Sequence, residues 1–182
     1  MIETEAAAKR WYAMRDLKRK NALHPAYEQL SESGLQVFTP LRNALVAGRG
    51  GNKVRRTVPV IPDLLFVREA KDVLDPVVAS IPTLQYRYRR GYSAATPTTV
   101  RDADMNYFIM ATRAAENPRY YLPEEITPDM LRRRIRIVGG PLDGIEGCLL
   151  TVRGSRSRRL LVEIPGFISA AVEVEPEYIQ LV

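Results

Sequence analysis

The chain has 182 residues, of which 46% are hydrophobic and 26% charged, and its formal net charge is +6. This composition matches that of ordinary globular proteins and excludes the disordered and collagen-like classes. No apolar run approaches the roughly 20 residues that a membrane-spanning helix needs, and the N-terminus lacks the apolar core of a secretory signal. We therefore expect a cytoplasmic protein that does not enter a membrane.

The sequence offers no catalytic or metal-binding constellation. Cys148 is the only cysteine and His24 the only histidine, so neither an internal disulfide nor a Cys/His metal cage can form. His24 precedes a proline, which favours an extended conformation directly before a helix. Asp102 and Asp104 could act as acid or base, but the start of a helix attracts acidic residues anyway. We expect no enzyme and no cofactor.

The excess positive charge lies in the first part of the chain. Residues 1–116 carry 18 Lys and Arg against 12 Asp and Glu, whereas residues 117–182 carry nine of each. The basic residues gather in three segments, 15–20, 49–56 and 86–90. Such segments are either separate solvated loops or one pooled surface for a polyanion.

Hydrophobic periodicity predicts an α+β fold for residues 1–116, with an antiparallel sheet flanked by helices. The expected elements are a strand at 11–15, a helix at 25–33, a strand at 35–39, a basic hairpin at 42–56, a strand-rich run at 58–67, a helix ending at Ser80, a strand at 83–89 and a helix at 101–115. Pro59 and Pro62 place the strand-rich run at an edge or bulge. Pro76 is tolerable only in the first turn of its helix.

The pattern changes after residue 116. Residues 117–130 contain three prolines and no periodicity, which predicts a semi-rigid linker and a domain boundary. Beyond it, short apolar strands are expected at 133–138, 147–152, 158–164, 168–174 and 178–182. Five short strands at near-regular spacing indicate a small SH3-like β-barrel over residues 131–182.

One turn in the second half is specific. Residues 134–152 read RIRIVGGPLDGIEGCLLTV, with a Gly140-Pro141 turn and with Gly144 and Gly147 around an acidic residue. A tight turn between strands needs backbone conformations that are closed to residues with a β-carbon. The segment resembles a KOW motif, which occurs in several ribosomal proteins and in transcription elongation factors of the NusG family.

The first half distinguishes between these groups of proteins. The segments RWYAMRDLKRK, QVFTP and VPVIPDLLFV follow one another in the order of the NusG N-terminal (NGN) domain, and the resemblance covers residues 9–182. Leu64 stands where a tyrosine is usual, which resembles the specialised antitermination paralogues of the UpxY type that are associated with polysaccharide operons. The resemblance implies an NGN-like domain over 1–116 and a KOW barrel over 131–182.

The resemblance also implies a function, that of an operon-specific transcription antitermination or elongation factor that modulates pausing or termination. Its first domain would bind the clamp helices of the largest RNA polymerase subunit, and we expect a monomer. The matching apolar positions are Ile61, Leu64 and Phe66, joined by Tyr12. Strand alternation puts Leu64 and Phe66 on one face, and the residues alone leave open whether that face is core or partner surface.

Nucleic acid and further protein partners are implied in the same way. Lys18, Arg19 and Lys20 match the family surface that approaches upstream DNA and the non-template strand, through contacts directed at phosphates. The hairpin residues Arg49, Lys53, Arg55 and Arg56 form either a solvated arm or a DNA contact. Phe167 and Ile168 are candidates for binding a ribosomal protein or the termination factor Rho.

A second class of function stays open. A KOW-containing RNA-binding or ribosome-associated protein would concentrate positive charge on the barrel. The neutral balance of residues 117–182 counts against that class.

Overall fold

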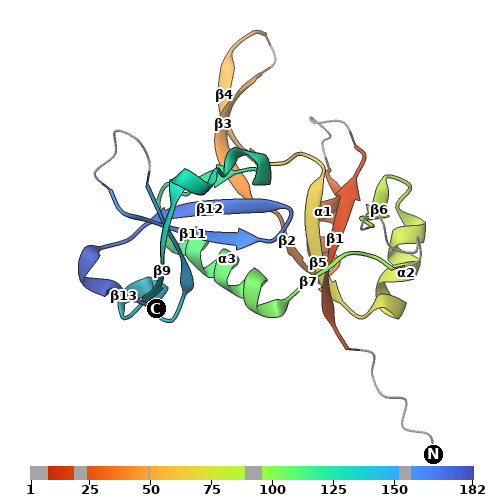
Figure 1. Cartoon of the computed structure of the whole chain (residues 1–182). Coiled ribbons are helices and arrows are strands. Elements are labelled where there is room, and N and C mark those ends of the chain that lie inside the picture. The colour runs from red at the N-terminus through yellow and green to blue at the C-terminus, as the bar shows by residue number, and fades with distance from the viewer. Residues whose placement is uncertain (1–7, 19–23, 49, 89–95, 152–156) are drawn as a thin grey trace, which may run out of the picture. The chain divides into compact units, whose positions relative to one another are not determined.

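The computed structural model describes residues 8–18, 24–48, 50–88, 96–151 and 157–182. Their contacts divide the chain into two compact units, Met1–Val100 and Arg101–Val182 (Figure 1). Each unit combines helix with antiparallel sheet, so the predicted α+β class is confirmed. Within the described residues, no helix is long and apolar enough to cross a membrane.

An antiparallel sheet forms the centre of the first unit. Its strands lie in the order β2–β5–β1–β6, and β7 also pairs with β1. Their bounds are Arg10–Asp16 for β1, Gln36–Phe38 for β2, Leu64–Glu69 for β5, Leu84–Tyr86 for β6 and Thr99–Val100 for β7. In the ladder between β1 and β5, Tyr12 lies opposite Val67 and Met14 opposite Leu65, so these four side chains share one face of the sheet.

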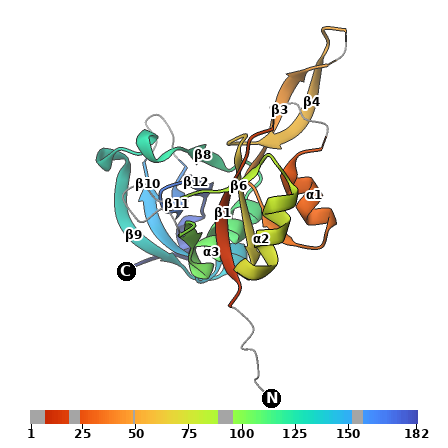
Figure 2. The same ribbon diagram turned by 90° about the vertical axis from the view of Figure 1, so that its right-hand side faces the viewer.

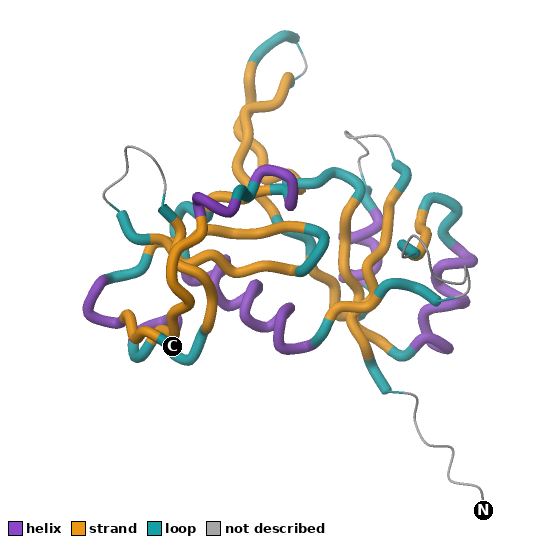
Figure 3. Tube along the Cα trace, in the orientation of Figure 1, coloured by secondary structure: helices purple, strands orange, loops and turns teal. Residues whose placement is uncertain are grey.

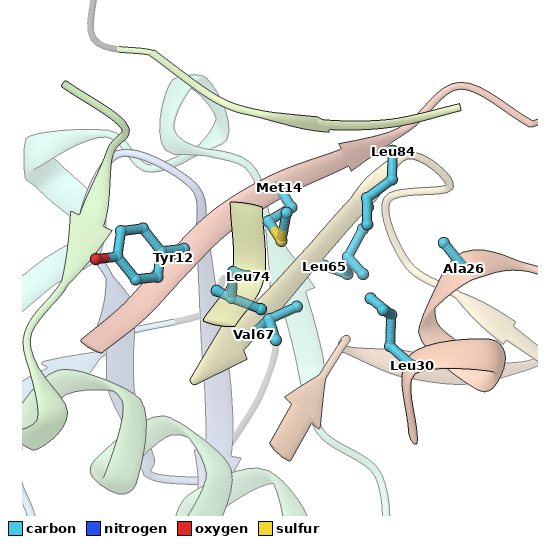
Figure 4. Packing of buried hydrophobic residues seen from close by; sticks show 8 residues of the cluster. All are labelled: Tyr12, Met14, Ala26, Leu30, Leu65, Val67, Leu74 and Leu84. Carbon is cyan, nitrogen blue, oxygen red and sulfur yellow. The ribbon is translucent and has the colours of Figure 1, made fainter. Parts of the chain in front are cut away.

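Two helices cover that face. They are α1 (Ala26–Glu32) and α2 (Lys71–Ser80), and they contribute Ala26, Leu30 and Leu74 to its core. Figure 4 shows this cluster with side chains from both helices and from the sheet. Helix α1 starts directly after Pro25, which confirms the expected helix start after His24.

The position of Pro76 differs from the sequence prediction. Helix α2 begins at Lys71, so Pro76 lies in its second turn rather than its first. A proline there removes one backbone hydrogen bond. The helix nonetheless packs Leu74, Val77 and Val78 against the core cluster, and an ion pair joins Lys71 to Asp75 along its exposed side. Tertiary packing therefore outweighs the local cost of the proline.

The basic segment near residue 50 forms a two-stranded sheet of its own. Strand β3 covers Leu41–Ala47 and β4 covers Lys53–Pro59, paired in continuous antiparallel register. This confirms the hairpin expected at 42–56. We refer to β3, β4 and their connection as the arm.

The second unit contains a sheet in the order β13–β9–β10–β11–β12–β8 together with helix α3 (Asp102–Ala114). The strands are Arg119–Tyr121 for β8, Leu131–Ile137 for β9, Glu146–Leu150 for β10, Arg159–Ile164 for β11, Ile168–Glu173 for β12 and Ile179–Leu181 for β13. Five of them confirm the strands expected after residue 130. In the described part of the chain no ladder joins β13 to β12 or β8, so a closed barrel stays a prediction.

Both faces of this sheet are covered. On one face, Leu150, Leu161 and Ala171 form a buried cluster, and the partly buried residues packed against it are Tyr121, Ile126, Met130 and Leu131. On the other face, α3 runs against β11 and β12, and the Phe108 ring centroid lies 6.4 Å from that of Tyr120. The covering segments are thus α3 and the stretch that leads from β8 to β9.

This arrangement corrects the expected linker. Residues 117–130 contain β8, which pairs with β12, and two 3-10 helices, Pro123–Glu125 and Pro128–Met130. Contacts divide the chain after Val100 instead, so α3 also belongs to the second unit. Two of the three prolines, Pro123 and Pro128, begin the 3-10 helices, where a missing N–H costs nothing, rather than marking a segment without packing.

We expect Ile126→Ala and Met130→Ala each to lower the free energy of unfolding of the full chain by about 1–2 kcal/mol. Replacing a fully buried isoleucine or methionine by alanine costs about 2–5 kcal/mol of stability. These two side chains are only partly buried, against the cluster of Leu150, Leu161 and Ala171. Chemical denaturation monitored by circular dichroism measures the change. The control is Glu124→Ala at an exposed position of the same stretch, which should change stability by less than about 0.5 kcal/mol. Equal, negligible effects of all three would restore the linker interpretation.

Candidate functional site

The arm is an antiparallel ribbon that carries positive charge without any acidic residue. Residues 41–59 include five Lys and Arg and no Asp or Glu. The strands lie side by side along their length in both views (Figure 1 and Figure 2), and Figure 3 shows them as one long two-stranded element. A hydrogen bond from the Thr57 hydroxyl to Asn43 Oδ1, 3.1 Å long, links the two strands.

The register of the arm separates its basic side chains. Each stands opposite a neutral residue: Arg42 opposite Val58, Lys53 opposite Ala47, Arg55 opposite Leu45 and Arg56 opposite Ala44. Like charges placed directly opposite would destabilise a ladder, and this pairing avoids them. Alternation then puts Lys53 and Arg55 on one face and Arg42 and Arg56 on the other.

The charges of the arm are available to a ligand. The four basic side chains just named are exposed. Within the described residues no ion pair or side-chain hydrogen bond engages any of them. Leu45, 64% exposed, lies among them. Arg42 was not among the DNA-contacting residues expected from the sequence. Its position on the strand before the glycine-rich turn was the signal that could have identified it.

The other two basic segments differ from the arm, because their described residues have partners. Asp63 Oδ2 accepts a hydrogen bond of 3.0 Å from Arg87 Nη2 and lies 3.2 Å from Arg15 Nε. Burial lowers the pKa of the Arg87 guanidinium below its usual value, and the nearby charge of Asp63 opposes that shift. Arg15 and Arg87 therefore help to hold the end of β1 beside the start of β5.

Lys18 is also engaged by the protein itself. Its ammonium group donates a 2.6 Å hydrogen bond to the carbonyl of His24, and its backbone N–H donates to Asp16 Oδ1 at 3.1 Å. The buried Asp16 carboxylate accepts a second bond, of 2.7 Å, from the N–H of Ala26 at the start of α1. Lys18 thus helps to hold the end of β1 beside the start of α1. Arg19 and Lys20, expected beside it in a nucleic-acid contact, lie outside the described residues.

The four apolar residues expected to contact polymerase do not form one surface. Leu64 and Phe66 are 3% and 0% exposed and share the face that carries Ala13, which lies opposite Phe66. Tyr12 points to the other face, where its ring packs edge-on against Tyr86 at 5.7 Å. Ile61 lies half-buried in the turn before β5. The structure therefore separates Tyr12 from Leu64 and Phe66 by the thickness of the sheet.

The glycines of the KOW-like turn have two different roles. Gly140 and Gly144 have φ angles of +69° and +79°, which favour glycine, and Pro141 lies in the 3-10 helix Gly140–Leu142. Gly147 lies instead within β10, where an added β-carbon would stand 2.3 Å from the carbonyl oxygen of Leu161. Close approach of β10 to β11, rather than turn conformation, requires this glycine.

The residues expected to bind a partner in the second unit lie at the connection between β11 and β12. Ile168 is 1% exposed and pairs with the buried Ile164, so it is a core residue without free surface. Phe167 is half-buried in the adjoining turn. Of this pair only Phe167 presents side-chain surface.

Comparisons with known proteins give a structural likeness. No family model and no curated protein matches the chain. A solved structure described as "Domain interaction in Thermotoga maritima NusG" aligns with 96% of this chain and 97% of its own, with 16% sequence identity and a TM-score of 0.43. The family assignment therefore depends on the residue pattern.

We expect Gly147→Ala to destabilise the full chain by about 1–3 kcal/mol, the usual cost of overpacking, because the new methyl group would force β10 away from β11. Thermal and chemical unfolding measure this. Cys148→Ala, a small reduction at the next, half-buried position, is the control and should cost less. If Gly147→Ala were as stable as the parent, the close approach would be wrong.

Proposed function

We propose that the chain is a NusG-type transcription elongation or antitermination factor, specialised for particular operons, which acts in the cytoplasm as a monomer without catalysis or cofactor. The proposal is supported by the order of the segments 11–15, 60–67 and 134–152, which resembles that family. The observation that carries it is the arm. Its exposed basic residues lack partners among the described residues, and the ribbon contains no acidic residue.

In this proposal the arm contacts DNA near the polymerase, either upstream duplex or the non-template strand. Exposed Arg and Lys side chains on a ribbon can reach phosphates, and such contacts are independent of base sequence. A two-stranded ribbon also fits the width of the DNA major groove. Arg42 and Arg56 on one face, and Lys53 and Arg55 on the other, would allow contacts on both sides.

The proposed polymerase contact uses the sheet face that carries Leu64 and Phe66. A helix bound in an apolar groove needs such anchors. Both side chains are buried, so a partner helix would have to replace the side chains that cover them. Tyr12 lies on the opposite face and is left out of this contact, while Ile61 in the turn before β5 remains in it.

A second candidate function is a KOW-containing RNA-binding or ribosome-associated protein. It gains support from a cluster of exposed arginines on β9. For the second unit, the proposed protein partner is a ribosomal protein or Rho, bound at Phe167.

We expect neutralising either face of the arm to weaken DNA binding. The double variants Arg42→Gln/Arg56→Gln and Lys53→Gln/Arg55→Gln each remove two charges from one face. Each should reduce the slope of log affinity against log salt by up to about 1.8, because each phosphate contact on duplex DNA contributes about 0.9. Fluorescence anisotropy with a labelled duplex, over a salt series, measures the slope.

A variant with the same loss of charge elsewhere serves as the control. Arg113→Gln/Arg119→Gln removes two exposed arginines of the second unit and should leave the slope within about 0.3 of the parent, a tolerance well below one phosphate contact. An unchanged slope in both arm variants would remove the arm from the DNA contact. An effect of only one arm variant would assign the contact to a single face.

We expect Leu64→Met to weaken binding to core RNA polymerase several-fold and Leu65→Met to leave it unchanged. The two neighbours are equally buried, 3% and 2% exposed, but point to opposite faces. Replacing leucine by methionine conserves volume and costs less than about 1.5 kcal/mol, so both variants should fold. Binding by surface plasmon resonance and unfolding by denaturant are measured in parallel. Equal binding of the two variants would contradict the assignment of the face.

Phe66→Ala gives the complementary measurement. Because Phe66 is fully buried, we expect the substitution to lower the free energy of unfolding by about 3–5 kcal/mol.

A transcription assay on a template with a pause and a terminator tests the proposed function itself. The parent protein should change pausing or termination by the polymerase; no change with polymerase bound would overturn the proposed activity.

A further inference from the structure

The second unit has a strongly uneven distribution of charge that its neutral total conceals. Residues 131–159 carry eight Arg against two acidic residues, whereas residues 160–182 carry four acidic residues and no basic one. All 11 basic residues of 101–182 are arginines. The neutral balance of residues 117–182 therefore gives no measure of the local field around β9.

Strand β9 presents four of these arginines to solvent. Arg132, Arg133, Arg134 and Arg136 are all exposed, while Ile135 and Ile137 between and after them are buried. Strict alternation would turn Arg133 to the same side as Ile135. The register between β9 and β10 shifts in this part of the ladder, between the pairs of Cys148 and Leu150. A β-bulge of this kind re-aims side chains, and it allows three consecutive arginines to reach solvent.

A fifth arginine lies at the same end of the sheet. Leu150 pairs with Leu131 on one side and with Arg159 on the other, so the starts of β9 and β11 flank the end of β10. Arg158, exposed and directly before β11, therefore lies at the same end as Arg132. We call these five residues the β9 arginine surface: Arg132, Arg133, Arg134, Arg136 and Arg158.

Acidic residues neutralise only part of this surface. Glu146 forms ion pairs with Arg136 and, at 3.4 Å, with Arg134, and these arginines hold the pKa of the Glu146 carboxyl below its usual value, with Arg136 the larger cause. A hydrogen bond from the Thr127 side chain is the main cause of a lowered pKa of Asp129, and the charge of Arg132 adds a smaller contribution. Arg132 Nε donates a 3.0 Å hydrogen bond to the Thr151 hydroxyl. Among these five arginines, the described acidic neighbours are thus Glu146 and Asp129.

We propose that the β9 arginine surface binds the phosphate backbone of a single-stranded nucleic acid. Charge complementarity selects a polyanion. Alternate residues of a strand are about 6.8 Å apart, which equals the rise of about two nucleotides along one strand, so Arg134 and Arg136 can follow every second phosphate.

The shape of the surface and its use of arginine favour a single strand over a duplex. Strand β9 is flanked by β13 and β10, so it is no projecting element that could enter a duplex groove. The planar guanidinium group binds phosphate with two parallel hydrogen bonds and stacks on exposed bases, and bases are exposed in single strands. This surface is independent of the arm. It deepens the second candidate function, nucleic-acid binding by the second unit, and does not rest on the proposed role in transcription.

The test uses the full chain with the four basic residues of the arm replaced by glutamine, so that the arm does not contribute. The probe is a short labelled oligouridine RNA, compared with oligothymidine of equal length and with duplex DNA. In this background Arg132→Gln/Arg133→Gln should weaken binding to the single strand on the order of tenfold. It should also lower the log–log salt slope by about 1.4, since each phosphate contact on a single strand contributes about 0.7.

The matched control is Arg113→Gln/Arg119→Gln, which removes the same charge from exposed positions of the same unit and should change affinity less than about twofold, because it removes no phosphate contact. Equal losses in the two variants, or none in the first, would overturn the proposal. Tighter binding to duplex than to either single strand would overturn it as well.

Glu146→Gln provides a gain of binding that a merely structural role would not produce. It releases Arg134 and Arg136 from their shared carboxylate, so affinity for the single strand should rise several-fold and the salt slope should steepen. An unchanged affinity would exclude these two arginines from the surface.

Discussion

The ladder between β1 and β5 is the constraint on which the first unit depends, because both strands are buried on both faces. Residues 11–14 and 64–67 are all buried, which is the pattern of central strands covered on two sides. Charged residues are therefore found at the ends of these strands, where Asp63 engages Arg15 and Arg87. Binding to a polyanion is left to elements with an open side, and in the first unit the arm is such an element.

The candidate binding surfaces differ mainly in whether their basic side chains already have partners within the protein, rather than in how many basic residues they contain. Lys18 donates to a backbone carbonyl and Arg87 to a carboxylate, so moving either to a phosphate would first break an internal bond. No such bond has to be broken for the arm residues Arg42 and Arg56. Because breaking an internal bond offsets part of what a new contact contributes, the unpaired arginines of the arm favour a ligand more than Lys18 or Arg87 does.

Periodicity was enough to predict the helices and strands whose own residues follow a helix or strand period, including the five strands after residue 130. The glycine-rich turn between basic ends predicted the arm. It did not predict β8, because Arg119–Tyr121 is only three residues long and gains its stability from pairing with β12 about 50 residues later. Ile126 and Met130 are likewise isolated apolar residues in a polar, proline-containing stretch. A local sequence pattern does not reveal a pairing partner so distant in the chain, so residues 117–130 were interpreted as a linker.

The site residues show the same limit at finer scale. Alternation correctly places Leu64 and Phe66 on one face, but Tyr12 could be assigned to a face only once its register with Val67 was known. The bulge near Arg132 and Arg133 is also a property of the pairing with β10. Without it, one of these arginines would be expected inside, and the arginine-rich strand would look like an alternating strand with one costly buried charge.

The two basic surfaces belong to different units, which has a consequence for how affinity depends on salt. Each surface alone offers a few exposed charges, and individual exposed ion pairs contribute little, about 0–1 kcal/mol. A single nucleic acid that engaged both would bind the second surface at an effective concentration set by the connection between the units, so its affinity would exceed that of either contact. The salt slope would then be close to the sum of the two separate slopes, because each neutralised phosphate releases its own counterions. Two ligands bound independently would instead give two separate slopes. Joint engagement thus predicts a steeper salt dependence than either unit shows by itself, even though no contact of either surface has become stronger.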